Sequence, residues 1–199
     1  MAEEKLRTEI RREQIVEAAF ELLGTQDPAT LSVASVARRV GLVPSAVYRH
    51  FRGKDEILDS VVELIGRRLL EIVQSVRDHT SDSLERLRRL LMRHIRFVRE
   101  NSAIPRIILV DAFQVRESKR KSKSYKVIRA YLDRIIQIVA EGQEAGKIRP
   151  ELDAQTVASG LLGIVQSGAV MWYLSEGDFD VTRHAQRGWE LLATAIESK

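Results

Sequence analysis

The chain has 199 residues, which is long enough for one or two small domains with a hydrophobic core. Its 44% hydrophobic and 30% charged residues exclude a disordered protein and favour a soluble globular one. Because the sequence contains no cysteine, a disulfide framework and a thiolate nucleophile or metal site are excluded. The net charge of +4 permits nucleic acid as a partner without requiring it.

The first predicted element is a helix over residues 4–23, in which apolar residues recur near helical spacing. Residues 1–14 contain no apolar segment typical of a secretory signal, so we expect a cytoplasmic protein. A loop follows at residues 24–30, where glycine, aspartate and proline occur together. Few alternating β-branched runs occur along the chain, and we therefore predict an all-α fold.

Residues 32–54 predict two short helices joined by a tight turn, and the rest of the chain is organised around them. The first helix has apolar residues at helical spacing, and Ser32 caps its first turn. Gly41 ends this helix, because glycine readily adopts the left-handed backbone of a sharp helix exit. Pro44 begins the second helix, since its fixed φ suits the first helical position. This spacing is typical of a helix-turn-helix.

The second helix is predicted to turn Val47 and Phe51 towards the first, which leaves an outer side free for a partner. Residues 30–54 contain five basic residues and no acid, and such a segment suits the phosphate-lined major groove, which admits an α-helix. The alternative is an ordinary helical hairpin with a solvated basic face. The outer side carries Pro44, Ser45, Tyr48 and Arg49.

Two segments in this region resemble a known family. Residues 47–51 read VYRHF and residues 53–58 read GKDEIL, which is similar to the signature that closes the helix-turn-helix and opens the fourth helix of TetR-family transcriptional regulators. The resemblance is specific over residues 10–60. It is looser over the remainder, where the length and the number of predicted helices agree.

The resemblance implies that Tyr48, His50 and Lys54 lie at the DNA backbone and that the outward residues after Pro44 touch bases. One position departs from the family pattern: Val43 stands where the family usually has Ser or Thr, so a helix cap and a phosphate contact are missing. The predicted DNA-binding residues are Ser32, Pro44, Ser45, Tyr48, Arg49, His50 and Lys54.

The predicted domain boundary lies at Gly53. A helix-turn-helix domain of residues 1–53 is followed by a larger effector-binding and dimerisation domain of residues 54–199. A helix over residues 55–76 has an apolar stripe about six turns long, which is too long to serve the small domain alone. We therefore expect this helix to link the two domains mechanically.

The next predicted helix, over residues 84–98, has arginines opposite an apolar stripe. They are interpreted as a solvated face, with a second DNA-binding surface as the alternative. A short apolar element over residues 106–115 contains Asp111, and a long helix with a basic start follows over residues 116–139.

Residues 154–175 contain no charge over 22 positions, which approaches the length of a membrane span. The many small and polar residues in this segment argue against membrane insertion, and we expect a helix covered by its own domain on one side and by a second copy on the other. Together with a last helix over residues 180–196, it predicts a four-helix dimer interface. The predicted interface residues are Gly160, Gly163, Ser167, Val170, Trp189 and Leu192.

Asp111 and Gln166 are polar residues in apolar surroundings, so each is either satisfied within the core or faces a ligand pocket. An effector pocket is implied by the family resemblance. Its predicted residues are Phe97, Asp111, Phe113, Gln166 and Trp172.

The sequence contains no pattern that indicates a metal site, a cofactor or catalysis. The four histidines are scattered, without a second ligand three or four residues away, and no nucleophile motif occurs. We therefore predict a homodimeric, sequence-specific transcriptional regulator. It acts as a repressor that a small, largely apolar effector releases from a near-palindromic operator. Two alternatives stay open, a ligand-independent architectural DNA-binding protein and a helical enzyme.

Overall fold

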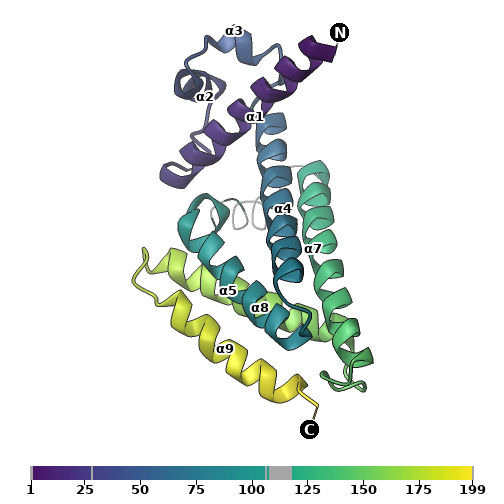
Figure 1. Ribbon diagram of the computed structural model, residues 1–199. Coiled ribbons are helices and arrows are strands. Elements are labelled where there is room, and N and C mark those ends of the chain that lie inside the picture. Colours follow the sequence, from purple (N-terminus) through teal and green to yellow (C-terminus); the bar gives the residue numbers. More distant parts are fainter. Residues whose placement is uncertain (1, 28, 106, 108–117, 199) are drawn as a thin grey trace. The chain divides into compact units, whose positions relative to one another are not determined.

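The computed structural model describes residues 2–27, 29–105, 107 and 118–198. Within these ranges the regular structure is helical and contains no β-strand, which confirms the predicted all-α fold. The helices are α1 (Ala2–Thr25), α2 (Val33–Val40), α3 (Pro44–Val47), α4 (Lys54–His79), α5 (Ser83–Glu100), α7 (Ser118–Glu144), α8 (Ala154–Leu174) and α9 (Val181–Ile196) (Figure 1).

The chain divides into two compact units. One consists of residues 1–65 and 102–125, and the other of residues 66–101 and 126–199. Both α4 and α7 contribute residues to each unit, so two of the three boundaries fall within helices, and the third lies just after α5, between residues 101 and 102. The boundary proposed at Gly53 stays a prediction.

The first unit has a core in which α1 packs against α2. Ile15, Ala19 and Leu23 are fully buried along one side of α1, at intervals of four residues that keep them on one helical face. Val36 and Ala37 of α2 are equally buried. The apolar spacing therefore produces the packing expected from it, and it fixes the helix-turn-helix on α1.

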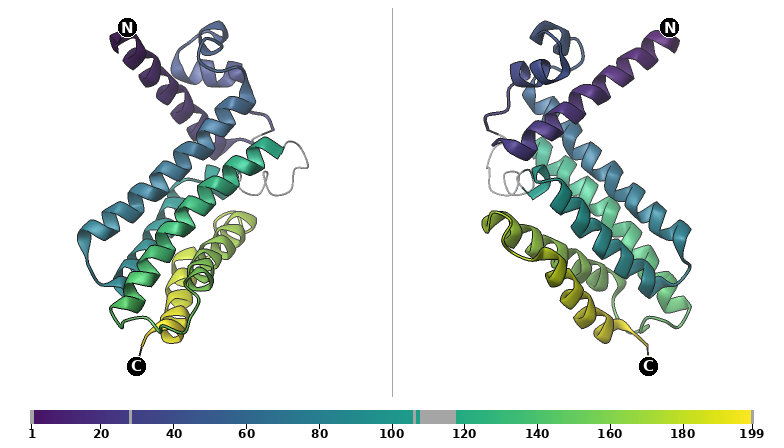
Figure 2. Two further views of the ribbon diagram at one scale, coloured as in Figure 1. Left: turned by 90° about the vertical axis from the view of Figure 1, so that its right-hand side faces the viewer. Right: turned by 60° about the vertical axis from the view of Figure 1, so that its left-hand side comes forward.

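The second unit has a core formed by α5, α8 and α9, which contact one another pairwise (Figure 2). Two glycines allow α8 and α9 to approach closely. A Cβ atom on Gly188 would lie 2.7 Å from Cγ2 of Ile164, and one on Gly168 would lie 2.9 Å from Cδ2 of His184. Larger residues at these positions would push the two helices apart.

Arg88, Arg96 and Arg99 of α5 are exposed, as the interpretation of a solvated face predicts, and Arg86 is an exception. Arg86 donates from Nε to the Thr80 carbonyl, 2.6 Å away, and pairs with Glu141 of α7 at 2.7 Å. Arg77 of α4 pairs with the same carboxylate. The sequence could not show this network, because Glu141 lies 55 residues from Arg86.

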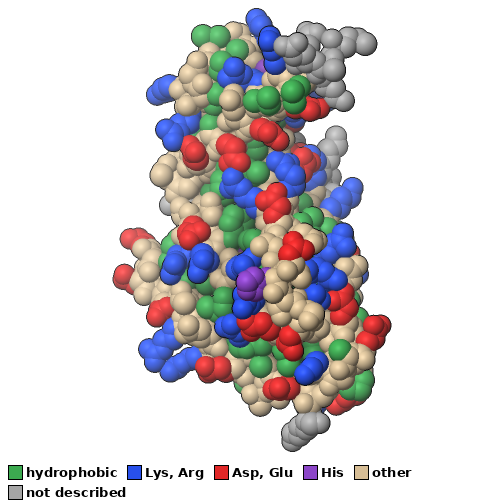
Figure 3. Space-filling model, in the orientation of Figure 1, with side chains coloured by type: hydrophobic (Ala, Val, Ile, Leu, Met, Phe, Trp, Pro, Cys, Tyr) green, Lys and Arg blue, Asp and Glu red, His purple; other side chains and the backbone are tan. Residues whose placement is uncertain are grey.

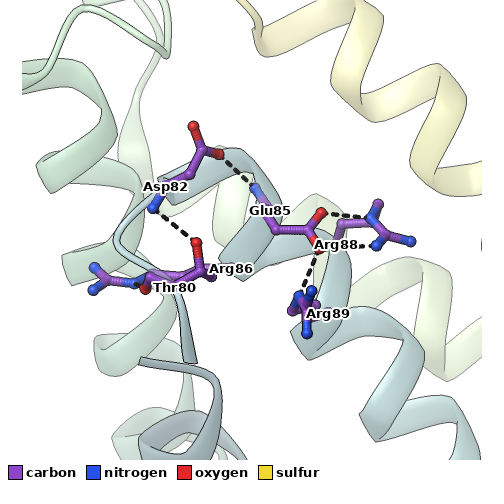
Figure 4. A network of polar contacts seen from close by, with 6 residues as sticks. All are labelled: Thr80, Asp82, Glu85, Arg86, Arg88 and Arg89. Carbon is purple, nitrogen blue, oxygen red and sulfur yellow. Dashed lines mark hydrogen bonds and ion pairs between the residues drawn. The ribbon is translucent and has the colours of Figure 1, made fainter. Parts of the chain in front are cut away.

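Figure 4 shows how the start of α5 is fixed by local contacts as well. The Asp82 carboxylate caps the helix by accepting a hydrogen bond from the Glu85 N–H at 2.8 Å. Glu85 in turn pairs with Arg88 and Arg89, and hydrogen bonds from Arg88 lower the pKa of its carboxyl to about 2. These partners account for part of the arginine run.

The uncharged helix α8 is buried on one side only within this chain. Val157, Leu161 and Val165 pack inwards, whereas most other positions are exposed or half-buried. By length and composition α8 is apolar enough to cross a membrane, a test that core helices of soluble proteins also pass. The large apolar side chains exposed on these two helices are Met171, Tyr173 and Leu174 of α8 and Leu191 of α9.

Candidate nucleic-acid interface

The turn of the helix-turn-helix has the geometry expected from its glycine. Gly41 adopts a left-handed conformation with φ of 73°, and its N–H is directed to the carbonyls of Ala37 and Arg38. Pro44 occupies the first turn of α3. Val43 precedes it in an extended conformation (φ −83°, ψ 148°) without a side-chain cap, as its departure from the family pattern predicted.

The second helix of the motif is shorter than the sequence pattern suggested. α3 ends at Val47, and the chain continues through Tyr48, Arg49 and His50 as a turn. There, the N–H groups of Arg49 and His50 bond to carbonyls three residues back, which tightens the backbone. Val47 and Phe51 are nonetheless buried as predicted, at 0% and 2% exposure.

The outer side of this segment is open to solvent. Pro44, Ser45, Tyr48 and Arg49 are all exposed, and Tyr48 is 57% accessible. In Figure 3, Lys and Arg side chains occur over the part of the surface that α1, α2 and α3 form. An exposed short helix with cations around it has the shape and charge that a DNA major groove accepts.

Arg12 of α1 fixes the end of the motif, a role that the sequence did not reveal. Its guanidinium donates to the His50 carbonyl, pairs with Glu56 at 3.3 Å and lies over the Phe51 ring at 4.1 Å. Glu56 also accepts the Arg52 N–H at 2.8 Å, and this backbone hydrogen bond lowers the pKa of its carboxyl. One arginine thus ties α1, the turn and the first turn of α4 together.

Two predicted DNA-binding residues have side-chain hydrogen bonds inside the protein, and a third is partly enclosed. The Ser32 hydroxyl caps α2 by accepting the Ser35 N–H at 3.0 Å. Lys54 donates from Nζ to the Ala29 carbonyl at 2.7 Å, which uses one of its three N–H donors. His50 is half-buried, and its Nδ1 is enclosed without a hydrogen-bond partner. Their contacts with DNA stay a prediction.

The structure describes three of the five residues predicted for an effector pocket, and their grouping in a pocket stays a prediction. Phe97 and Trp172 are half-buried, whereas Gln166 is exposed on α8. Gln166 lies three residues from Gly163, in the register of the predicted interface and not on the inward side of the helix. Asp111 and Phe113 lie outside the described residues.

A buried polar pair on α5 and α7 was missed by the sequence analysis. The Tyr131 hydroxyl lies 3.0 Å from Nδ1 of His94, and the two rings are packed edge to face. Burial lowers the pKa of His94 to about 4 and raises that of Tyr131, so both side chains are neutral at neutral pH. Helical spacing places Phe97 on the same side of α5 as His94.

The predicted interface residues all lie at positions that this chain leaves uncovered or half-covered. Gly160, Gly163 and Ser167 are exposed, and nothing lies within 4 Å of a Cβ atom added to Gly163. The Ser167 hydroxyl is satisfied within the chain by the Gly163 carbonyl at 2.9 Å. Val170, Trp189 and Leu192 are half-buried. Their contact with a second copy stays a prediction.

Within the described ranges, no three His, Cys, Asp or Glu side chains lie close enough together to hold a metal ion. The organised feature is instead the helix-turn-helix with its exposed basic side. Fold and site together define a helix-turn-helix DNA-binding regulator.

Matches to family models identify the family of regulators to which the chain belongs. Residues 15–61 match the model of bacterial regulatory proteins of the tetR family, and residues 62–195 match that of the C-terminal region of YsiA-like proteins. The chain belongs to the TetR family of transcriptional regulators, as its signature residues predicted.

Individual relatives agree with this assignment. The chain is 26% identical over 189 residues to the nucleoid occlusion factor SlmA of Vibrio vulnificus strain YJ016, covering 94% of this chain and 96% of that protein. Its fold is similar to that of the fatty acid degradation regulator FadR from Bacillus halodurans, with a TM-score of 0.80, 21% identity and coverage of 92% and 94%. The fold is also similar to that of FadR from Bacillus subtilis, which was solved in complex with stearoyl-CoA. That comparison has a TM-score of 0.76 and 19% identity, and it covers 93% of this chain and 99% of that one.

Proposed function

We propose that the protein is a cytoplasmic, homodimeric repressor that acts by binding and not by catalysis. Two copies of α3 enter successive major grooves of a near-palindromic operator, with their centres about 34–36 Å apart. Ser45 and Arg49 read base edges, and Tyr48 and Lys54 bind phosphates. The observation that carries this proposal is the exposed outer side of residues 44–49 on a turn fixed by Gly41.

The uncovered side of α8 supports the homodimer. A helix without charge that is buried on one side only would leave an uncharged surface of small, polar and apolar residues exposed in a monomer, including Met171, Tyr173 and Leu174. Pairing α8 and α9 with the same helices of a second copy buries this surface in a four-helix bundle. The dimer also supplies the second recognition helix that a near-palindromic operator requires.

The effector is proposed to be a largely apolar molecule with a polar group, and long-chain acyl-CoA is the first class to test. The support is the similarity in fold to FadR of Bacillus subtilis, which was solved with stearoyl-CoA. In this proposal the buried His94 and Tyr131 pair would offer a polar anchor to the effector, with the half-buried Phe97 on the same side of α5.

The DNA part is tested by selecting operators from random duplexes and measuring the affinity of variants at several salt concentrations. Arg49→Ala should cost roughly 1–3 kcal/mol at the selected operator and relax one base position. Lys54→Ala should weaken all sequences alike and lower the salt slope by about 0.9. Equal losses on random and selected DNA for both variants would contradict the proposed division of roles.

The effector part is tested by thermal unfolding and operator release in the presence of stearoyl-CoA, stearate or coenzyme A. Stearoyl-CoA should raise the unfolding temperature and release DNA, and the two fragments should act only at higher concentration. If the protein binds its operator but neither these compounds nor a broader apolar set has an effect, the ligand-independent architectural DNA-binding protein is the better description.

A further inference from the structure

A hollow of about 370 Å³ lies on the surface of the first unit, beside α1. The turn after α3 closes one side of it through His50. Its described lining residues are rich in hydrogen-bond donors, and none of them has a carboxylate. The lining residues are Arg7, Thr8, Ile10, Arg11, Gln14 and His50.

The lining has a positive charge from two arginines of α1. Arg11 donates to the Gln14 side-chain oxygen at 2.9 Å, which orients the guanidinium without neutralising it. The adjacent Arg12 differs, because its charge is paired with Glu56 and its donors hold the His50 carbonyl. Arg12 therefore holds the end of the motif, whereas Arg7 and Arg11 line the hollow.

His50 connects the hollow with the exposed recognition segment. It follows Tyr48 by two residues and Arg49 by one, and both of these side chains are exposed. Desolvation, together with the positive charges of Arg12, Arg11 and Arg49, lowers the pKa of His50. An anion in the hollow would offset this concentration of positive charge.

We infer that this hollow binds a phosphate of the DNA backbone beside the bases that the recognition segment contacts, so that α1 forms an additional contact with the operator. A phosphodiester carries one negative charge and accepts hydrogen bonds from guanidinium and amide groups, which are the groups of Arg11 and Gln14. The inference rests on the proposed operator binding by α3.

The experiment combines protein and DNA changes. Selected operator duplexes receive a neutral methylphosphonate at one phosphate at a time, and each is titrated with wild type and with an Arg7→Ala/Arg11→Ala double variant. At one phosphate per half-site, neutralisation should weaken wild type several-fold and leave the double variant unchanged. The salt slope of the double variant should also be smaller, by roughly 0.9 for each phosphate that the protein no longer neutralises.

The matched control is Arg134→Ala on α7. Arg134 also donates to a glutamine three residues further on, Gln137, at 3.2 Å, and it is exposed. This variant should keep the wild-type salt slope and the wild-type sensitivity at every phosphate. If circular dichroism shows that the alanine double variant has lost helical content, the measurement is repeated with Arg7→Gln/Arg11→Gln, which preserves most of the side-chain length.

Two failures are distinguishable. If wild type binds the selected operator, yet it and the double variant respond alike at every phosphate and have equal salt slopes, the α1 contact does not exist. If wild type itself prefers no sequence, then the proposed operator binding by α3 is wrong, whatever the hollow does.

Discussion

The guanidinium carbon of Arg12 lies 4.1 Å from the centre of the Phe51 ring. Because the same side chain bonds to the His50 carbonyl and to Glu56, Arg12→Ala should lower the free energy of unfolding by about 1–3 kcal/mol. Denaturant titration measures this change. Arg11→Ala is the control, expected to stay within about 0.5 kcal/mol of wild type, and equal losses for both would show that the Arg12 contacts contribute nothing specific.

The contact of α8 with α9 depends on a glycine. Gly188→Ala should lower the free energy of unfolding by about 1–3 kcal/mol, because its Cβ atom would lie 2.7 Å from Ile164. Gly163→Ala has no such obstacle and should be neutral or raise helix stability by up to about 1 kcal/mol. Thermal unfolding compares the two variants, and a similar loss in both would mean that the close approach at Gly188 is not the cause.

Gly163 also tests the proposed homodimer. Gly163→Glu places a charge on the uncovered side of α8, where nothing lies within 4 Å of the added Cβ atom, so the single chain should still fold. Burying this charge in an interface would cost several kcal/mol, and light scattering at micromolar concentration should then show monomers for the variant and dimers for wild type. A wild-type monomer under these conditions would contradict the arrangement.

The buried His94 makes stability depend on pH. Because its pKa falls from 6.5 to about 4 on folding, the unfolded chain binds a proton in this window that the folded chain does not. The free energy of unfolding should therefore fall as pH decreases from about 6.5 towards about 4, by up to about 1.4 kcal/mol per pH unit from this group. Above about pH 6.5 this contribution is complete.

Replacing His94 isolates its share of this slope. Urea unfolding at several pH values should give a flatter dependence for His94→Gln than for wild type between about pH 4 and 6.5. The slopes of unfolding free energy against pH are compared and not the absolute values, because the substitution also changes the contact with Tyr131. Parallel profiles for the two proteins would show that His94 does not titrate in this window.

Two arginines of α5 should differ in their importance. The Arg86 side chain is 13% exposed and pairs with Glu141, whereas that of Arg88 is 47% exposed and pairs with Glu85 within the same helix. Arg86→Ala should cost roughly 1–3 kcal/mol, because Glu141 keeps Arg77 as a partner, and Arg88→Ala should cost less than about 1 kcal/mol. Denaturant unfolding measures the loss of unfolding free energy in each variant. Equal losses in the two variants would mean that the contact of Arg86 with α7 contributes no more than a surface ion pair.

Much of the fold could be predicted from local sequence signals. Gly41 and Pro44 place the turn, and the burial of Val47 and Phe51 follows from helical spacing. These signals depend on residues a few positions apart, which a single sequence displays. The early end of α3 was missed because a periodic pattern does not distinguish a continued helix from a tight turn that keeps the same residues inside.

The site was predictable only where exposure follows from periodicity, as for Ser45 and Arg49. The contacts of Arg12 join positions 38 and 44 residues apart, and no local pattern indicates them. Polarity within an apolar run was misleading for Gln166, which points outwards because α8 is covered on one side only. In such a helix an uncharged residue does not imply burial in its own chain.

The uncharged side of α8 also determines how the proposed assembly responds to ionic strength. The α8 part of the interface has no charged groups and therefore little Coulomb energy to screen, and salts that strengthen apolar burial should leave it intact or tighten it. Binding of the basic recognition segment to DNA releases counterions and weakens steeply as salt rises. As the salt concentration rises, the protein should therefore release the operator first and remain a dimer in solution.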